Sequence, residues 1–387
     1  MHILLQVVLI LLLAKAFGEL FERVGFPSIL GEISAGIFLG TMFSLNPDNE
    51  ILKFLAELGV ILLLFTTGYK EVNLRELKGI FKQSFPPTIF AVIIPFIFGI
   101  LLGNVFNFTF LESLFIGVAL CPTSIGASVR VLIDLKYLST KVGSTILSAA
   151  ILDDVIAIFT LAVLMQIALY SKISVGQILT MGGKLVTFIL IMIIFGLHIL
   201  PKLFEYIHKM HVDEAVFTGV IVVALFSAFL ADELGLSAII GAFLGGLLLS
   251  TLPFAKIKDV QNKVNGVSYG IFVPIFFVLI GLSVDLSALI TAGLFAAILI
   301  ILALSGKVIG GFIGSKLVGF DSYDSLIFGV GMMPRAEVGI VIVSVGKTMG
   351  IIGSEVFSAM VLMVAISILV TPIALKYVIG LTKRSAS

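Results

Sequence analysis

Residues 117–132 read GVALCPTSIGASVRVL, and residues 329–344 read GVGMMPRAEVGIVIVS. A shift of 212 residues superimposes the two stretches, with the initial Gly–Val pairs and the prolines Pro122 and Pro334 in register. Each proline stands among polar residues inside an otherwise apolar segment. Proline removes a backbone hydrogen bond and collides with the preceding helical turn. We therefore expect a helix to be interrupted at both places.

Apolar residues dominate the rest of the chain as well. The protein has 387 residues, of which 59% are hydrophobic and 12% are charged, and its mean hydropathy is +1.23. A typical soluble domain has about 25% charged residues. Apolar runs long enough to cross a bilayer recur from end to end, which predicts an all-α polytopic membrane protein with about thirteen transmembrane helices.

Charge and motif content exclude several classes of protein. A formal net charge of +1 gives no electrostatic basis for binding nucleic acid. Cys121 is the only cysteine, which excludes an internal disulfide and a cysteine-based metal cluster. No HExxH motif is present, and the Gly–Lys pair at 306–307 lacks the earlier glycine of a phosphate loop. We expect no cofactor and no enzymatic activity.

Basic residues are unevenly distributed between alternate predicted loops. The regions 70–82, 136–141, 202–209 and 256–263 and the C-terminal tail are rich in Lys and Arg, whereas the opposite loops hold few. The positive-inside rule then places the C-terminus in the cytoplasm and the N-terminus outside. Residues 1–17 are similar to a signal peptide but lack a basic start, so we expect a retained first helix. The chain is expected to be a multi-pass protein of the plasma membrane.

The two matching stretches fall in the fifth and twelfth predicted spans, 112–134 and 322–349. Because seven spans separate them, the second runs through the membrane in the opposite direction. The pattern predicts an inverted repeat with two crossed, discontinuous helices, and such pairs mark a binding site near the bilayer midplane in transport proteins. Two proline-kinked helices with similar glycine packing are the alternative.

Asp153 and Asp154 lie in ILDDVIAI (151–158), with only aliphatic neighbours. One aspartate at the centre of a spanning helix costs roughly 2.5–3.5 kcal/mol. Adjacent helical residues point about 100° apart, so one carboxylate can pair with a buried cation while the other faces a water-filled cavity. Lys307, in the glycine-rich stretch 303–314, is the natural partner. A buried ion pair that only fixes helix register is the alternative, and it leaves Asp154 unexplained.

Oxygen atoms suited to a hard cation are expected beside these carboxylates. Thr123 and Ser124 supply hydroxyls, and the break at Pro122 frees backbone carbonyls at a half-helix end of partial negative charge. The constellation predicts a site for a small monovalent cation that competes with protons for a carboxylate. Asp154, Thr123 and Ser124 are the expected metal ligands.

Two further charged residues, Arg335 and Glu337, stand at the second break. A local ion pair that satisfies the broken helix is the favoured interpretation of these two residues. A direct role at the ion site is the alternative.

The stretches ILDDVIAI, CPTSIGASVRVL, GKVIGGFIG and GMMPRAEVGIVI together resemble monovalent cation:proton antiporters of the NapA- and Kef-related branch. PSILGEISAGIFLG near the start and LGLSAIIGAFLGGLLLS at 234–250 add to the resemblance, which covers essentially the whole chain. It implies an NhaA-like antiporter fold, with a core that holds the crossed helices and a separate panel that forms a homodimer.

The resemblance also divides the chain. It implies that residues 1–83 provide N-terminal helices of the dimerisation panel and 84–170 the first half of the ion-transport core. Residues 171–212 form a linker helix, residues 213–286 further panel helices, and residues 287–387 the second half of the core.

Carried over position by position, Asp154 matches the essential ion-binding carboxylate, Asp153 the carboxylate that pairs with Lys307, and Thr123 and Ser124 the polar break. Paired aspartates are typical of electrogenic sodium/proton members. Kef-type potassium systems usually have Gln before the Asp and a cytosolic nucleotide-binding domain, which we do not expect here. The resemblance thus implies exchange of Na⁺, with Li⁺ as a second substrate, for H⁺ in pH homeostasis.

Three other functions compete with this interpretation. A potassium/proton antiporter of the same fold is the first, because no residue sets the size of the ion cavity. A sodium-coupled organic-anion symporter is the second, and Arg335 is its one obvious anion anchor. A cation channel is the third.

Overall fold

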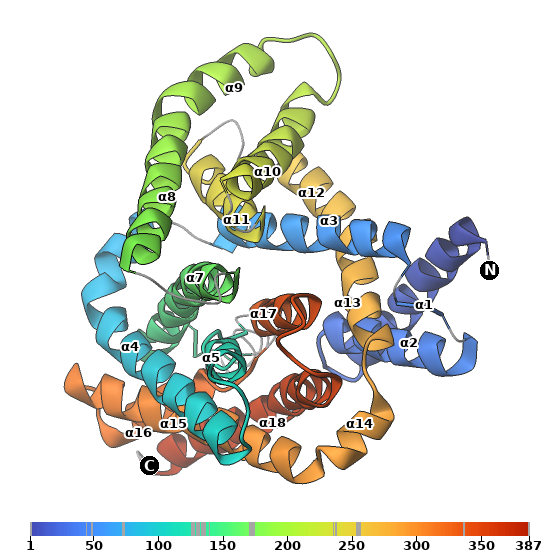
Figure 1. Ribbon diagram of the computed structural model, residues 1–387. Helices are drawn as coiled ribbons and strands as arrows, with labels where there is room; N and C mark the ends of the chain where they lie inside the picture. The colour runs from blue at the N-terminus through green and yellow to red at the C-terminus, as the bar shows by residue number, and fades with distance from the viewer. Residues whose placement is uncertain are drawn as a thin grey trace. The chain divides into compact units, whose positions relative to one another are not determined.

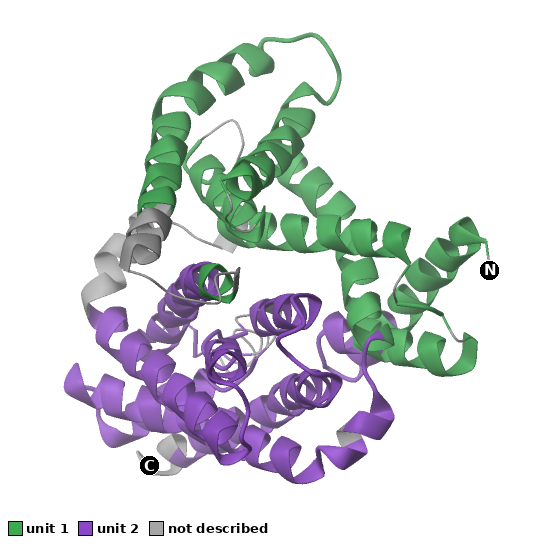
Figure 2. Ribbon diagram, in the orientation of Figure 1, with its two compact units in different colours: residues 1–18, 31–75, 165–282 green, residues 19–30, 76–164, 283–387 purple. Residues whose placement is uncertain are grey.

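The computed structural model describes residues 2–385, apart from residues 44, 48, 72–73, 125–127, 129–131, 133–136, 139, 170–174, 235, 237, 253–256 and 336. The described residues form helices and no strand (Figure 1). Contacts between Cα atoms divide the chain into two compact units (Figure 2). Unit 1 comprises residues 1–18, 31–75 and 165–282, and unit 2 comprises residues 19–30, 76–164 and 283–387.

Unit 1 contains most of the first three helices and a continuous block of helices from the middle of the chain. Its elements are α1 (Ile3–Arg23), α2 (Ser28–Phe43), α3 (Glu50–Thr66), α8 (Val175–Ile194), α9 (Leu200–His208), α10 (Ala215–Glu233), α11 (Ala238–Leu249), α12 (Lys258–Val267) and α13 (Val273–Leu282), with π-helical turns η1 (Thr67–Glu71), η2 (Phe195–Ile199) and η3 (Ser268–Phe272). Helix α3 packs against both α11 and α13. Glycines allow these contacts, because a Cβ atom on Gly59 would lie 3.0 Å from the Phe276 Cβ atom on α13, and one on Gly246 of α11 would meet the Phe65 backbone on α3.

Unit 2 contains the two matching stretches. Its elements are α4 (Leu74–Val105), α5 (Phe110–Ala119), most of α7 (Lys141–Leu169), α14 (Leu286–Thr291), α15 (Gly293–Leu317), α16 (Ser322–Gly331), α17 (Glu337–Thr348) and α18 (Ser354–Ser385). One apolar core joins α7, α15, α16 and α18 and includes Ile146, Phe328 and Leu375.

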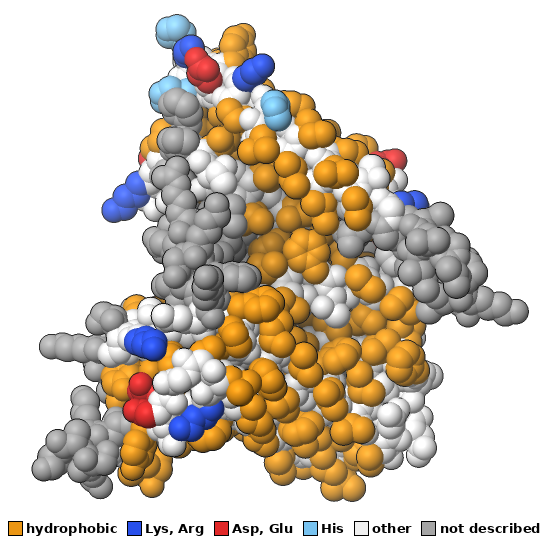
Figure 3. Space-filling model, turned by 90° about the vertical axis from the view of Figure 1, so that its left-hand side faces the viewer, with side chains coloured by type: hydrophobic (Ala, Val, Ile, Leu, Met, Phe, Trp, Pro, Cys, Tyr) orange, Lys and Arg blue, Asp and Glu red, His pale blue; other side chains and the backbone are white. Residues whose placement is uncertain are grey.

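Helix length and surface composition fit a membrane protein. Among the described residues, nine helical segments are long and apolar enough to cross a bilayer, and four shorter apolar helices cover residues 28–43, 110–119, 238–249 and 338–348. Large hydrophobic side chains are exposed on many helices, and they predominate on the face drawn in Figure 3. Such a surface is stable in lipid rather than in water. The number of about thirteen spans stays a prediction.

The repeat seen in the sequence is also present in the structure of unit 2. Helices α5 and α16 begin and end 212 residues apart. A Cβ atom on Gly99 would lie 2.5 Å from the Gly117 Cα atom, and one on Gly311 would lie 2.7 Å from the Gly329 Cα atom. The same shift relates these two glycine pairs, so α4 meets α5 as α15 meets α16. Small residues permit this close approach of two backbones.

Both broken helices end before the matching prolines. Helix α5 ends at Ala119, and residues 121–124 are not helical; α16 ends at Gly331, and α17 begins at Glu337. The predicted interruptions are confirmed. Proline alone does not cause them, since Pro95 and Pro372 lie inside continuous helices. Neighbouring groups can satisfy the backbone freed by such prolines.

Replacing Gly311 with alanine is expected to destabilise unit 2. The new methyl group would meet the Gly329 backbone, so α15 and α16 must separate, at a cost of roughly 1–3 kcal/mol. Thermal unfolding of the purified protein in detergent measures the loss. Gly183→Ala on α8 is the matched control, because no atom lies within 4 Å of the added methyl group. Equal melting temperatures for the two variants would contradict the packing described here.

Candidate functional site

The candidate site lies in unit 2, where the first break meets α7 and α15. Residue Asp153 on α7 and Lys307 on α15 have no exposed surface. The Lys307 Nζ atom lies 2.7 Å from the Asp153 Oδ2 atom and donates to it. The same ammonium group also donates to the Cys121 carbonyl oxygen at the end of the first break. A fully buried ion pair of this kind is costly to form and is held by additional hydrogen bonds.

Thr123 supplies those additional bonds. Its backbone N–H donates to the Asp153 Oδ1 atom (3.2 Å), and its hydroxyl donates to the Asp153 Oδ2 atom (2.5 Å). The hydroxyl oxygen also lies 3.3 Å from the Met332 carbonyl oxygen in the second break. Thr123 therefore connects the carboxylate of Asp153 to both broken helices.

Asp154 follows Asp153 on α7 and is buried, with 5% of its surface exposed. Its side chain leaves the helix about 100° around the axis from that of Asp153, so the two carboxylates cannot occupy one position. Asp153 lies in the ion pair, whereas Asp154 carries a second buried carboxyl group on the same turn.

Two serines add further hydrogen bonds between the broken helices. The Ser124 N–H donates to the Pro334 carbonyl oxygen (2.8 Å), and the Ser128 hydroxyl donates to the Gly331 carbonyl oxygen. Gly331 is the last residue of α16 and Pro334 follows shortly after, where helical carbonyls lack partners within the helix. Ser124 is thus brought to the crossing by its backbone, and its side chain is buried.

Arg335 is also fully buried, and it contacts the first break. Its Nη1 atom donates to the Pro122 carbonyl oxygen (3.1 Å), and its Nη2 atom donates to the Ala303 carbonyl oxygen on α15 (2.9 Å). Its backbone N–H donates to the Ser367 hydroxyl on α18 (2.9 Å). The side chain of Glu337 lies outside the described residues, so the predicted local pair stays a prediction.

The sequence missed several parts of this site. The carbonyls freed by the break at Pro122 were expected to serve as ligands of a cation, and in this structure Lys307 donates to the Cys121 carbonyl and Arg335 to the Pro122 carbonyl. Ser367 carried no sequence signal, because a lone serine in an apolar helix is common. The 212-residue shift does hold a signal for Arg335, since it aligns that residue with Thr123.

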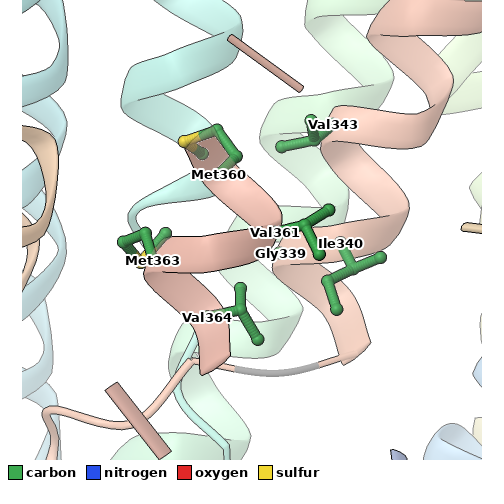
Figure 4. Close-up of a pocket in the computed structure, with 7 residues that line it drawn as sticks. All are labelled: Gly339, Ile340, Val343, Met360, Val361, Met363 and Val364. Carbon is green, nitrogen blue, oxygen red and sulfur yellow. The ribbon is translucent and has the colours of Figure 1, made fainter. Parts of the chain in front are cut away.

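Other features of the described residues do not suggest a second ion site. They contain no group of three or more His, Cys, Asp or Glu side chains that could hold a metal ion. An apolar pocket lies between α17 and α18 (Figure 4), lined by Gly339, Ile340, Val343, Met360, Val361, Met363 and Val364. Its walls lack the oxygen atoms that a hard cation requires.

The fold and the site together define a class of protein. Buried, paired charges beside two crossed broken helices are characteristic of secondary active transporters. Residues 8–379 match the family described as "Sodium/hydrogen exchanger, transmembrane". The chain belongs to this family, whose members are transporters and not enzymes.

Two relatives match over almost their full length. The Na⁺/H⁺ antiporter of Enterococcus hirae is 33% identical over 372 residues, which cover 95% of this chain and 96% of the relative. The Na⁺/H⁺-K⁺ antiporter GerN of Bacillus cereus is 32% identical over 376 residues, which cover 97% of this chain and 96% of the relative.

A solved structure has the same fold. The sodium proton antiporter MjNhaP1 from Methanocaldococcus jannaschii at pH 8 superimposes with a TM-score of 0.68, covering 95% of this chain and 94% of that chain. At 17% sequence identity, this similarity concerns the fold alone.

Proposed function

We propose that the protein is an electrogenic antiporter that exchanges Na⁺, with Li⁺ as a second substrate, for H⁺ by alternating access. One observation carries the proposal: a fully buried Lys307–Asp153 pair lies beside Asp154 at the crossing of two broken helices. The relatives named as Na⁺/H⁺ antiporters support it, because they match along nearly the whole chain.

Asp154 is the proposed ion-binding carboxylate, with Thr123 and Ser124 as further ligands. A hydroxyl group has two acceptor lone pairs, so Thr123 can turn its proton to Asp153 or Met332 and still offer oxygen to a cation. Sodium is a hard cation that prefers such oxygen ligands. Protons and sodium compete because both require the ionised carboxylate of Asp154.

Lys307 is the proposed carrier of a second proton. When sodium enters, its charge weakens the attraction between Lys307 and Asp153, and the buried ammonium group loses its proton to water. Sodium then leaves on the other side of the membrane, and protons reload Asp154 and Lys307 for the return. Two protons for one sodium moves net charge in every cycle.

The remaining assignments follow the same proposal. Unit 2 holds the candidate site, so it is the proposed transport core, and unit 1 is the proposed source of the dimerisation panel of a homodimer. The proposed location is the plasma membrane, surrounded by lipid, with the N-terminus outside and the C-terminus in the cytoplasm.

Potassium/proton exchange is the second candidate function. The printed name of GerN includes K⁺ as well as Na⁺. The two functions use the same carboxylate and differ in the ion that fits between its ligands.

A test of ion identity separates the two candidates. Purified protein is reconstituted in liposomes that contain a pH-sensitive dye, and Na⁺, Li⁺, K⁺ or choline chloride is added outside. We expect proton movement with Na⁺ and Li⁺ and a baseline response with K⁺ and choline. A response to K⁺ alone would reject the sodium assignment.

A further inference from the structure

Two buried cations contact successive carbonyls of the first break. Lys307 donates to the Cys121 carbonyl oxygen, and Arg335 donates to the Pro122 carbonyl oxygen. Among the described residues, the carbonyl oxygens of the second break accept instead from neutral donors of the first half, which are Thr123, Ser124 and Ser128. Both positively charged side chains of the site therefore contact the chain just after the carboxyl end of α5.

Arg335 also contacts the helix that carries Lys307. Its Nη2 atom donates to the Ala303 carbonyl oxygen on α15 (2.9 Å). Ala303 precedes Lys307 by four residues, which is one helical turn, and its carbonyl is the regular helical acceptor for the Lys307 N–H. The guanidinium group therefore holds the turn of α15 from which the Lys307 side chain extends.

Arg335 is itself held in place from α18. Its N–H donates to the Ser367 hydroxyl (2.9 Å), and that hydroxyl donates to the Val364 carbonyl oxygen (2.8 Å). Ser367 has no exposed surface. The orientation of the Ser367 hydroxyl is thus fixed by its own helix, and this hydroxyl in turn holds Arg335, a residue of the second break between α16 and α17.

We propose that Arg335 is the positioning residue for Lys307: it ties α15 to the first break, so that the ammonium group reaches Asp153 and the Cys121 carbonyl together. The inference rests on the proposed function for what Lys307 does, and it goes beyond that function in naming what places Lys307. A planar guanidinium group can donate to two carbonyls at once, which a lysine ammonium on a flexible stem does less well.

The inverted repeat supports this role. Arg335 occupies the position equivalent to Thr123, whose N–H and hydroxyl bind Asp153. In the second half the equivalent N–H binds the Ser367 hydroxyl, and a guanidinium group stands where the first half has a hydroxyl. One break thus positions the carboxylate, and the other positions its cationic partner.

A double-variant cycle tests the proposal. Turnover, the sodium KM and the number of protons moved per sodium are measured for Arg335→Gln, Lys307→Gln and the double variant in liposomes. A displacement of about 1 Å at a reacting group can cost on the order of 10²-fold in rate. We expect Arg335→Gln to lower turnover by about this factor and to lower the proton count as Lys307→Gln does.

The decisive comparison is the effect of Arg335→Gln on turnover in the wild-type protein and in the Lys307→Gln variant. If Arg335 acts through Lys307, adding Arg335→Gln to Lys307→Gln changes turnover less than about twofold. Losses that multiply, or a single Arg335→Gln variant that keeps the full proton count, would overturn the proposal. Arg23→Gln is the matched control, because the Arg23 side chain is 76% exposed and pairs with Glu19 one helical turn away.

Two more measurements keep the proposal testable. Ser367→Ala should reproduce the Arg335→Gln effects in weaker form, whereas an unchanged proton count and turnover would overturn the role given to Arg335. Thermal unfolding of the same four proteins requires no transport. We expect Arg335→Gln to lower the melting temperature less in the Lys307→Gln background than in the wild-type protein. Equal shifts would overturn the positioning role even if wild type failed to move sodium, which would separately refute the proposed function.

Discussion

Asp154→Asn is expected to reduce sodium-driven proton flux to the background of empty liposomes, with little change in thermal stability. Asparagine keeps the size of the side chain but cannot carry the proton that sodium must displace. It also removes the negative charge that attracts the cation. Dye-loaded liposomes measure the flux, and thermal unfolding in detergent measures the stability.

The control for this variant is Asp213→Asn, which changes an exposed aspartate between α9 and α10. We expect that variant to transport at the wild-type rate. Full exchange by Asp154→Asn would contradict the assignment of Asp154 as the ion-binding carboxylate, because an asparagine side chain cannot exchange a proton for sodium.

Lys307→Gln is expected to convert the remaining exchange from electrogenic to electroneutral and to destabilise the protein. Without the ammonium group one proton fewer is moved per sodium, so the cycle no longer carries net charge. Removing one partner also leaves the Asp153 carboxylate buried without its cation, a loss of roughly 3–5 kcal/mol. Flux at different membrane potentials and thermal unfolding report the two effects separately.

A charge-neutral pair tests the origin of the instability. Asp153→Asn combined with Lys307→Gln should recover much of the melting temperature that Lys307→Gln loses, since the Asp153 carboxylate is no longer left buried without its cation. Lys316→Gln, at the exposed end of the same helix, should leave both measurements unchanged. If the Lys307→Gln variant still moved net charge, another group would have to carry the second proton.

The sequence predicted the breaks because two independent signals agreed at each of them. Pro122 and Pro334 lie among polar residues, and the 212-residue shift aligns both surroundings. Pro95 lacked the polar neighbours and remains helical. The coupling of Asp153 with Lys307 was also predictable, because buried charges require partners and few charged residues occur deep in the predicted spans.

Other features could not be predicted because they depend on contacts far apart in the chain. The contact of Arg335 with Pro122 crosses 213 residues, and no local pattern encodes it. Unit 1 takes residues from both the first and the middle parts of the chain, so its limits follow packing rather than composition. The sequence also does not show that Lys307 and Arg335 donate to carbonyls at the break near Pro122, because no local pattern tells which donor reaches a freed carbonyl.

Electrogenic exchange is tested most directly by sodium-driven proton flux with and without a potassium-valinomycin clamp on the membrane potential. Electrogenic exchange builds up a voltage that opposes further transport, so we expect a faster and larger pH change when the clamp removes that voltage. Equal sodium-driven pH changes under both conditions would contradict it, because exchange without net charge leaves no role for a second proton on Lys307.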